Sequence, residues 1–319
     1  MVMISLTAVA LGAAFGGYLP LISLWMETFN ISFQKIGIVC GASAVGVVSS
    51  AYYAPKLAAR YGYIATINVG LVVAAIMTVA FRFTDNYGLW LALRFVSGLG
   101  LGLHWVLTEA WLANIVTEKY RTRVMAIYAT AISIGFAVGP MVIWLFGALS
   151  IIPFIIMGAL LILAALPILR LKGHEPKDSQ TRSASPLILI KKAPTVASAC
   201  IVVGSVDLAL ISLLPAMITR TPEAAPILAL IIVPAMAIGA TILQYPIAII
   251  ADKHGLRKVG VITVCAGLIF ASLIPFFLGS VLLTLLFGFF AAGLVYALYS
   301  IGLAMLSRRF YGAEIVAAN

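Results

Sequence analysis

Long apolar stretches alternate with short polar segments along the whole chain. The stretches run to about 20 residues, the length that an α-helix needs to cross the hydrocarbon core of a bilayer. They do not alternate between apolar and polar residues with a period of two, which excludes an outer-membrane β-barrel. The pattern predicts ten membrane-spanning helices, with boundary errors of about 2 to 4 residues, at about 4–25, 36–54, 64–81, 88–112, 124–147, 151–169, 195–217, 227–249, 259–279 and 281–305.

The composition points to the same class of protein. Of the 319 residues, 63% are apolar and 9% are charged, and the mean hydropathy is +1.15. A typical soluble domain is about half apolar and about a quarter charged, so a soluble globular protein is excluded. The first apolar stretch has no basic segment before it and is as long as the others, so we interpret it as the first span and not as a cleavable signal.

The sequence contains no motif that indicates an enzyme. It has no HExxH helix, no GxSxG turn and no GxxxxGK[ST] phosphate loop, and the missing phosphate loop argues against an ATP-driven pump. The three cysteines, Cys40, Cys200 and Cys265, lie in apolar stretches without CxxC spacing, which predicts neither disulfides nor a metal site. We therefore expect no cofactor and no metal.

The basic residues collect between alternate spans. There are 20 Lys and Arg against 10 Asp and Glu, and 16 of those 20 follow the second, fourth, sixth, eighth or tenth span. The segments on the other side hold only Lys35, Arg82 and Arg220. By the positive-inside rule, both ends of the chain lie in the cytoplasm and the protein is a multi-pass protein of the inner membrane. The excess of positive charge reflects topology, so a nucleic-acid partner is not predicted.

Two halves with a common plan are visible in the sequence. Residues 170–193 form the longest polar segment and predict a cytoplasmic linker between a six-helix bundle (1–169) and a second bundle of four helices (194–319). Residues 57–62 align with residues 250–255 at an offset of 193, and Gly100 aligns with Gly293 at the same offset. A duplicated bundle is typical of secondary transporters.

Four local motifs carry a resemblance to a known family. Residues 251–258 (ADKHGLRK) resemble the loop A-D-R-x-G-R-[KR] of the major facilitator superfamily, and residues 54–62 keep its basic residue and glycine but have Ala59 at the acidic position. Residues 94–102 (RFVSGLGLG) are similar to its R-x-x-x-G-x-G pattern. Residues 135–140 (GFAVGP) resemble the G-x-x-x-G-P motif of its antiporters, although the glycines that usually follow are absent.

The resemblance covers nearly the whole chain and looks closest to a branch of poorly characterised bacterial permeases. It implies an all-α polytopic fold with two bundles, but the family usually has twelve spans. We therefore expect either a truncated product or a ten-span variant with an incomplete second half. It also implies a cytoplasmic gate or latch formed by Asp252, Gly255, Arg257, Lys258, Arg60 and Gly62.

Small residues and a proline in the fourth and fifth spans allow close backbone approach and bending. In a rocking transporter they would serve a moving interface, and ordinary tight packing explains them equally well. These hinge or packing candidates are Gly98, Gly102, Gly135, Gly139 and Pro140.

Ionisable residues within the spans are functional candidates because they are costly in a bilayer. Arg94 has a functional and a structural interpretation. It contacts an anionic substrate group or sets the pKa of a nearby proton-carrying carboxylate, or else it satisfies backbone carbonyls as a structural residue. Glu109 lies about 22 Å further along the same helix, where it is either a proton acceptor or a gate lock to Arg121 or Arg123. His104, between them, is either a proton shuttle or a neutral, hydrogen-bonded histidine.

Asp207 is the one acid in the body of the second half's spans, about 18 Å into the seventh. A carboxyl group near the midplane can take up and release a proton, as coupling to a proton gradient requires, or can be a protonated structural acid bonded to a neighbouring helix.

These observations favour a secondary transporter of a small organic solute that works by alternating access. We expect proton coupling through Asp207 with help from Arg94, and the antiporter-like motif favours efflux. The partners would be the lipid bilayer, a small-molecule substrate and protons, with neither nucleic acid nor ATP. The alternatives are an uncoupled facilitator and a non-transporting receptor or decayed transporter remnant.

Overall fold

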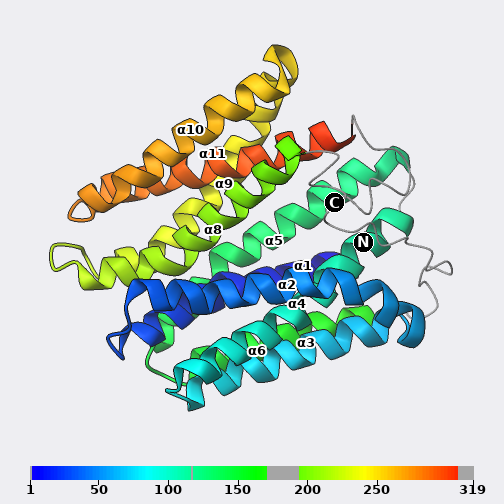
Figure 1. Ribbon diagram of the computed structural model, residues 1–319, viewed down its shortest axis with the longest axis horizontal. Helices are drawn as coiled ribbons and strands as arrows, with labels where there is room; N and C mark the ends of the chain where they lie inside the picture. The colour runs from blue at the N-terminus through cyan, green and yellow to red at the C-terminus, as the bar shows by residue number, and fades with distance from the viewer. Residues whose placement is uncertain (1, 116–117, 171–193, 308–319) are drawn as a thin grey trace. The chain divides into compact units, whose positions relative to one another are not determined.

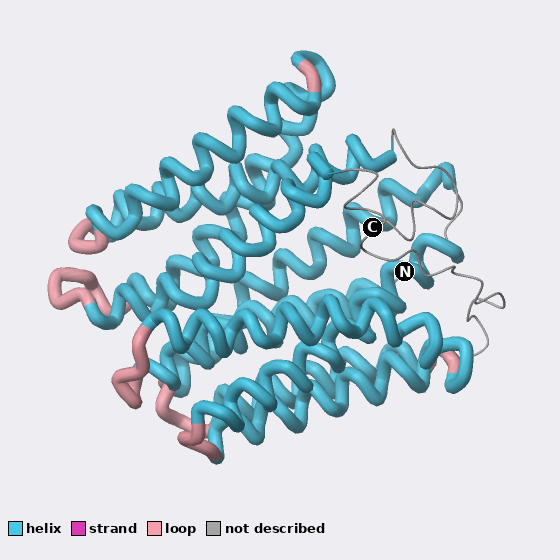
Figure 2. Tube along the Cα trace, in the orientation of Figure 1, coloured by secondary structure: helices cyan, strands magenta, loops and turns pink. Residues whose placement is uncertain are grey.

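The fold is entirely helical in the part of the chain that the structure describes. The computed structural model describes residues 2–115, 118–170 and 194–307, which form long α-helices joined by short turns (Figures 1 and 2). Residues 171–193 of the predicted linker lie outside the described residues. Contacts between Cα atoms divide the chain into two compact units, Met1–Thr181 (unit 1) and Arg182–Asn319 (unit 2).

Among its described residues, unit 1 consists of six long α-helices and one short 3₁₀ helix. Its helices are α1 (Val2–Glu27), α2 (Phe33–Tyr61), α3 (Tyr63–Ala80), the short 3₁₀ helix η1 (Phe81–Phe83), α4 (Tyr87–Ile115), α5 (Glu118–Phe146) and α6 (Ile152–Leu169). Unit 2 contains α8 (Pro194–Arg220), α9 (Leu228–His254), α10 (Leu256–Leu273), the 3₁₀ helix η2 (Ile274–Phe277) and α11 (Val281–Ser307).

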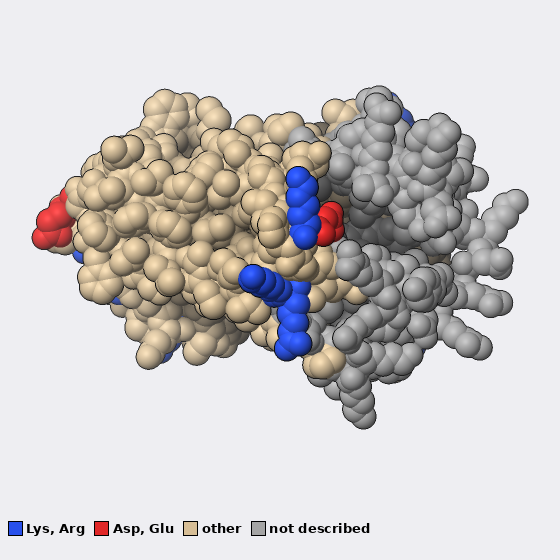
Figure 3. Space-filling model, turned by 90° about the horizontal axis from the view of Figure 1, so that it is seen from above, with Lys and Arg blue, Asp and Glu red and all other residues tan. Residues whose placement is uncertain are grey.

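Each predicted span overlaps one of these long helices, and the third and ninth predicted spans continue from α3 and α10 into η1 and η2. Among the described residues, nine helices are long and apolar enough to cross a membrane, and α5 adds a shorter apolar part, Ala131–Phe146. The prediction of a polytopic helical membrane protein is confirmed. On the face shown in Figure 3, most of the described surface is uncharged, and basic side chains gather beside an acidic one.

The ends predicted for the second and eighth spans were wrong. The apolar stretches stop near residues 54 and 249, but α2 continues to Tyr61 and α9 to His254. Lys and Arg are good helix formers, so a charged segment alone does not end a helix. The helices end at Gly62 and Gly255, which have φ angles of 86° and 99°.

The two glycine turns repeat each other across the 193-residue offset. The N–H of Gly62 donates to the Ala58 carbonyl at 2.8 Å, and the N–H of Gly255 donates to the Ala251 carbonyl at 2.9 Å. At the same offset, Gly46 packs on the backbone of α4 and Gly239 packs on the backbone of α11. The sequence repeat therefore has a counterpart in the structure.

Gly62→Ala and Gly255→Ala should each lower the free energy of unfolding by about 1–3 kcal/mol, because an L-residue is strained at these φ angles. Thermal unfolding of the purified protein measures the effect. Gly204→Ala is the matched control, since Gly204 lies inside α8 and a Cβ there meets nothing within 4 Å. An unfolding midpoint for Gly62→Ala equal to that of the control would contradict the prediction.

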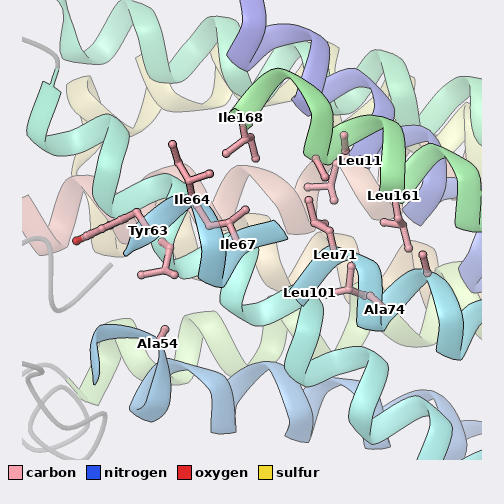
Figure 4. Packing of buried hydrophobic residues seen from close by; sticks show 14 of the residues in the cluster. Leu11, Ala54, Tyr63, Ile64, Ile67, Leu71, Ala74, Leu101, Leu161 and Ile168 are labelled. Atoms are coloured by element: carbon pink, nitrogen blue, oxygen red, sulfur yellow. The ribbon is translucent and has the colours of Figure 1, made fainter. Parts of the chain in front are cut away.

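The core of unit 1 joins five of its helices. Buried side chains of α1, α2, α3, α4 and α6 form one apolar cluster, which includes Leu11, Ala54, Ile67, Leu101 and Leu161 (Figure 4). The fifth helix, α5, packs along α1, where a Cβ on either Gly12 or Gly16 would overlap the α5 backbone. The contact faces of small residues let these helices approach closely.

The corresponding face in unit 2 is open in the described structure. In that unit, α11 packs against α8, α9 and α10, and α8 also contacts α9. At the repeat offset, Gly12 and Gly16 of α1 correspond to Ser205 and Ala209 of α8, and both are exposed. The side of α8 that corresponds to the α5-covered side of α1 is thus uncovered among residues 194–307.

Candidate functional site

Asp207 lies halfway along α8 and contacts a neighbouring helix. Thirteen residues of α8 precede it and thirteen follow it, and its side chain is half-buried. The Tyr296 hydroxyl donates a hydrogen bond to Asp207 Oδ2 at 3.0 Å. Tyr296 belongs to α11, so this bond joins two helices of unit 2 through an ionisable group. The chemistry available here is reversible protonation of a carboxyl group held by a phenolic donor.

Tyr296 was not among the candidates from sequence. It is separated from Asp207 by 89 residues, and helical periodicity places neither side chain relative to the other. The only available signal was that its hydroxyl, inside an apolar stretch, needs a hydrogen-bond partner.

Arg94 is fully buried in unit 1, at 0% exposure. One nitrogen, Nη2, donates to the Cys40 carbonyl of α2 at 3.4 Å, and the guanidinium carbon lies 5.0 Å from the centre of the Tyr18 ring of α1. The other two nitrogens, Nε and Nη1, have no hydrogen-bond partner among the described residues. The backbone contact agrees with the structural interpretation of Arg94, but it accounts for only one of the three nitrogens.

His104 and Glu109 follow Arg94 on α4. The His104 side chain is buried, its Nδ1 lies 3.5 Å from the Thr108 hydroxyl, and its Nε2 has no partner among the described residues. The side chain of Glu109 lies outside the described part of the structure, as do those of Arg121 and Arg123. The predicted lock between Glu109 and these arginines therefore stays a prediction.

The latch candidates of unit 2 meet at the junction of α9 and α10. Asp252 is exposed in the last turn of α9, and Arg257 and Lys258 are exposed in the first turn of α10. Gly255 occupies the N-cap position of α10, where no side chain makes a capping hydrogen bond.

In unit 1 the corresponding junction joins α2 and α3. Arg60 is exposed and lies 5.2 Å from the centre of the Tyr61 ring, and Gly62 ends α2. Each unit thus places a basic side chain and a left-handed glycine at the same turn of its repeat.

The glycine candidates all lie at helix contacts within unit 1. A Cβ on Gly98 would overlap the Ser43 carbonyl, and one on Gly102 would overlap the Ser50 hydroxyl, both in α2. A Cβ on Gly135 would overlap the Val9 carbonyl, and one on Gly139 the Ala13 carbonyl, both in α1. Pro140 is buried inside α5. These contacts support the packing interpretation, and a hinge role stays a prediction.

No group of three or more His, Cys, Asp or Glu within residues 2–115, 118–170 and 194–307 is placed to hold a metal ion.

Known proteins resemble this chain in sequence and in fold. The uncharacterized MFS-type transporter YfkF of Bacillus subtilis (strain 168) is 26% identical over 262 residues, which are 80% of this chain and 67% of YfkF. A mutant of the nucleoside transporter NupG matches with a TM-score of 0.80 and 17% identity, over 99% of this chain and 85% of NupG. A D-xylose-proton symporter matches with a TM-score of 0.70 and 17% identity, over 99% of this chain and 86% of the symporter.

The two structural matches show the fold, since their sequence identity is low. The sequence match is broader, because residues 4–318 fit the family model of the Major Facilitator Superfamily. This match covers nearly the whole chain and agrees with the motifs at Arg94 and at Asp252. The chain therefore belongs to the Major Facilitator Superfamily, a family of membrane transporters.

Proposed function

We propose that this protein is a proton-coupled secondary transporter of a small organic solute in the inner membrane, and that Asp207 carries the coupling proton. Membership of the superfamily supports transport by alternating access. The observation that carries the coupling proposal is the hydrogen bond from Tyr296 to Asp207, at the middle of α8. We keep the predicted division into a bundle at 1–169, a linker at 170–193 and a second bundle from 194.

The Asp207–Tyr296 pair links a change of charge to helix packing. A charged side chain near the centre of a bilayer costs at least about 2.5–3.5 kcal/mol, so the ionised carboxylate needs its donor. Proton uptake neutralises Asp207 and weakens the charge-assisted bond that ties α8 to α11. The protonation state then biases the packing of these two helices, which is the requirement for coupling a proton to a conformational change.

The remaining candidate residues bear on the cytoplasmic gate and on the direction of solute transport. We propose a cytoplasmic latch role for each of the two repeat junctions. Asp252 and exposed basic residues lie at the α9–α10 junction of unit 2, and Arg60 and Gly62 lie at the α2–α3 junction of unit 1. Residues 135–140 resemble the antiporter motif, so we propose efflux by antiport as the direction. The relationship of the fold to a D-xylose-proton symporter supports a proton as the coupling ion.

Two alternatives make different predictions. An uncoupled facilitator would carry the solute only down its own gradient. A receptor or transporter remnant would carry none.

Reconstitution into proteoliposomes tests the proposal. A thermal-shift panel of metabolites, sugars and antibiotics first selects solutes that raise the unfolding midpoint, because a ligand stabilises the state that it binds. The selected solute should then accumulate against its gradient when a pH gradient is imposed, and the accumulation should collapse with a protonophore. Transport that ignores the pH gradient indicates the facilitator, and no transport indicates the receptor or remnant.

Tyr296→Phe should slow uphill transport by about 2- to 10-fold, because the ring stays and one hydrogen bond to Asp207 is lost. The rate of solute-for-solute exchange should change less, since exchange needs no net proton movement. Tyr245→Phe is the matched control, because Tyr245 is 75% exposed on α9. Equal loss of uphill transport and exchange in Tyr296→Phe would indicate a structural role alone and contradict the prediction.

A further inference from the structure

Among the described residues, no acidic side chain pairs with the charge of Arg94. A guanidinium stays protonated under all physiological conditions, and Arg94 is 0% exposed in an apolar helical bundle. Its contacts in the described structure are one long hydrogen bond, 3.4 Å, to the Cys40 carbonyl and the ring of Tyr18. No ion pair of Arg94 with Asp or Glu is present among the described residues. An uncompensated buried charge is strongly destabilising, so a counter-charge is needed.

The polar groups next to Arg94 add hydrogen-bond donors. Tyr18 lies against the guanidinium and is 3% exposed, and its hydroxyl has no partner within the described structure. Ser97 follows Arg94 by three residues on α4, which places it on the same side of the helix, and its buried hydroxyl also lacks a partner. Arg94 Nε and Nη1, the Tyr18 hydroxyl and the Ser97 hydroxyl are thus four buried donors of unit 1 that have no partner among the described residues.

Arg82 shows how unit 1 accommodates an arginine without a counter-ion. Its Nη2 donates to the Leu149 carbonyl at 3.1 Å, and its guanidinium carbon lies 3.9 Å from the centre of the Trp25 ring. Arg82 belongs to η1, and its side chain is also partly exposed. Both contacts are shorter than those of Arg94, and solvent or lipid headgroups can reach it. The environment of Arg94 therefore differs from that of Arg82 in burial and in the length of its contacts.

We propose that Arg94, Tyr18 and Ser97 bind a small monovalent anionic group inside unit 1. A halide satisfies the donors as a free ion, and a carboxylate satisfies them as part of a small organic acid. The site does not require transport, so its failure leaves the role of Asp207 untouched. If the carboxylate is the ligand, the site also indicates organic acids as the substrate class, and that part rests on the proposed function.

Anion-dependent thermal stability of the purified full chain tests the site. Chloride, bromide and formate are added at constant ionic strength against gluconate, a much larger anion. The unfolding midpoint should rise by about 3 °C or more once the anion is about tenfold above its dissociation constant. Arg94→Gln should abolish the rise. Arg82→Gln, the matched control, should keep it even if its starting midpoint is lower.

Two milder variants keep the test informative if Arg94→Gln does not fold. Tyr18→Phe and Ser97→Ala each remove one hydroxyl donor and should raise the half-saturating anion concentration by about tenfold. A rise with halides identifies a free inorganic anion, and a rise with formate alone identifies an organic carboxylate. The proposal is overturned if no anion raises the midpoint, if Arg94→Gln responds like the original protein, or if both hydroxyl variants bind the anion unchanged.

Discussion

Asp207→Asn should abolish proton-driven accumulation of the solute while leaving exchange measurable. Asparagine has nearly the shape of the aspartic acid and can still accept a hydrogen bond from Tyr296, but it cannot take up or release a proton. We expect the initial rate of uphill transport in proteoliposomes to fall to background. Solute-for-solute exchange should stay within about threefold of the original protein, because the α8–α11 contact is preserved.

Asp85→Asn is the matched control for this substitution. Asp85 lies in the exposed segment between η1 and α4, and its loss should leave uphill transport unchanged. Proton-driven accumulation that persists in Asp207→Asn would contradict the coupling role of Asp207. A loss of both accumulation and exchange would indicate that the carboxyl group has a structural role.

Gly98→Ala should destabilise unit 1 by roughly 1–3 kcal/mol and lower the unfolding midpoint by several degrees. The new Cβ would overlap the Ser43 carbonyl, so the backbones of α2 and α4 would have to separate. Arg94 is anchored to α2 through the Cys40 carbonyl, and separation of these helices would also weaken that contact. Thermal unfolding and the amount of monodisperse protein measure the effect.

Gly41→Ala is the control, because Gly41 lies on α2 and a Cβ there meets nothing within 4 Å. Alanine has a higher helix propensity than glycine, so this variant should be as stable as the original protein or slightly more so. If Gly98→Ala is as stable as Gly41→Ala, the close packing of α2 on α4 does not exist as described.

The helices could be predicted from the sequence because one physical requirement dominates it. A bilayer demands about 20 apolar residues per span, and the spacing of those stretches is visible without knowledge of any contact. The ends of α2 and α9 were less predictable, since Lys56 and Lys253 are charged but helical. The glycines at 62 and 255 mark those ends, and both lie in the segments that repeat at offset 193.

The candidate site was predictable residue by residue but not as an arrangement. Asp207 and Arg94 stand out because ionisable residues are rare in membrane spans. Their neighbours Tyr296, Tyr18 and Cys40 do not stand out, because a tyrosine or cysteine in an apolar stretch is ordinary and its contacts depend on how the helices pack. The structure supplies these pairings, and with them the distinction between a hydrogen-bonded carboxyl group and an unbalanced guanidinium.

Proton movement itself tests the central claim most directly. Proteoliposomes that contain the full chain and an entrapped pH-sensitive dye are exposed to a gradient of a solute from the thermal-shift panel, with no pH gradient imposed. A coupled transporter should change the internal pH as the solute moves, and Asp207→Asn should not. Solute flux with no change of internal pH in the original protein would contradict the account.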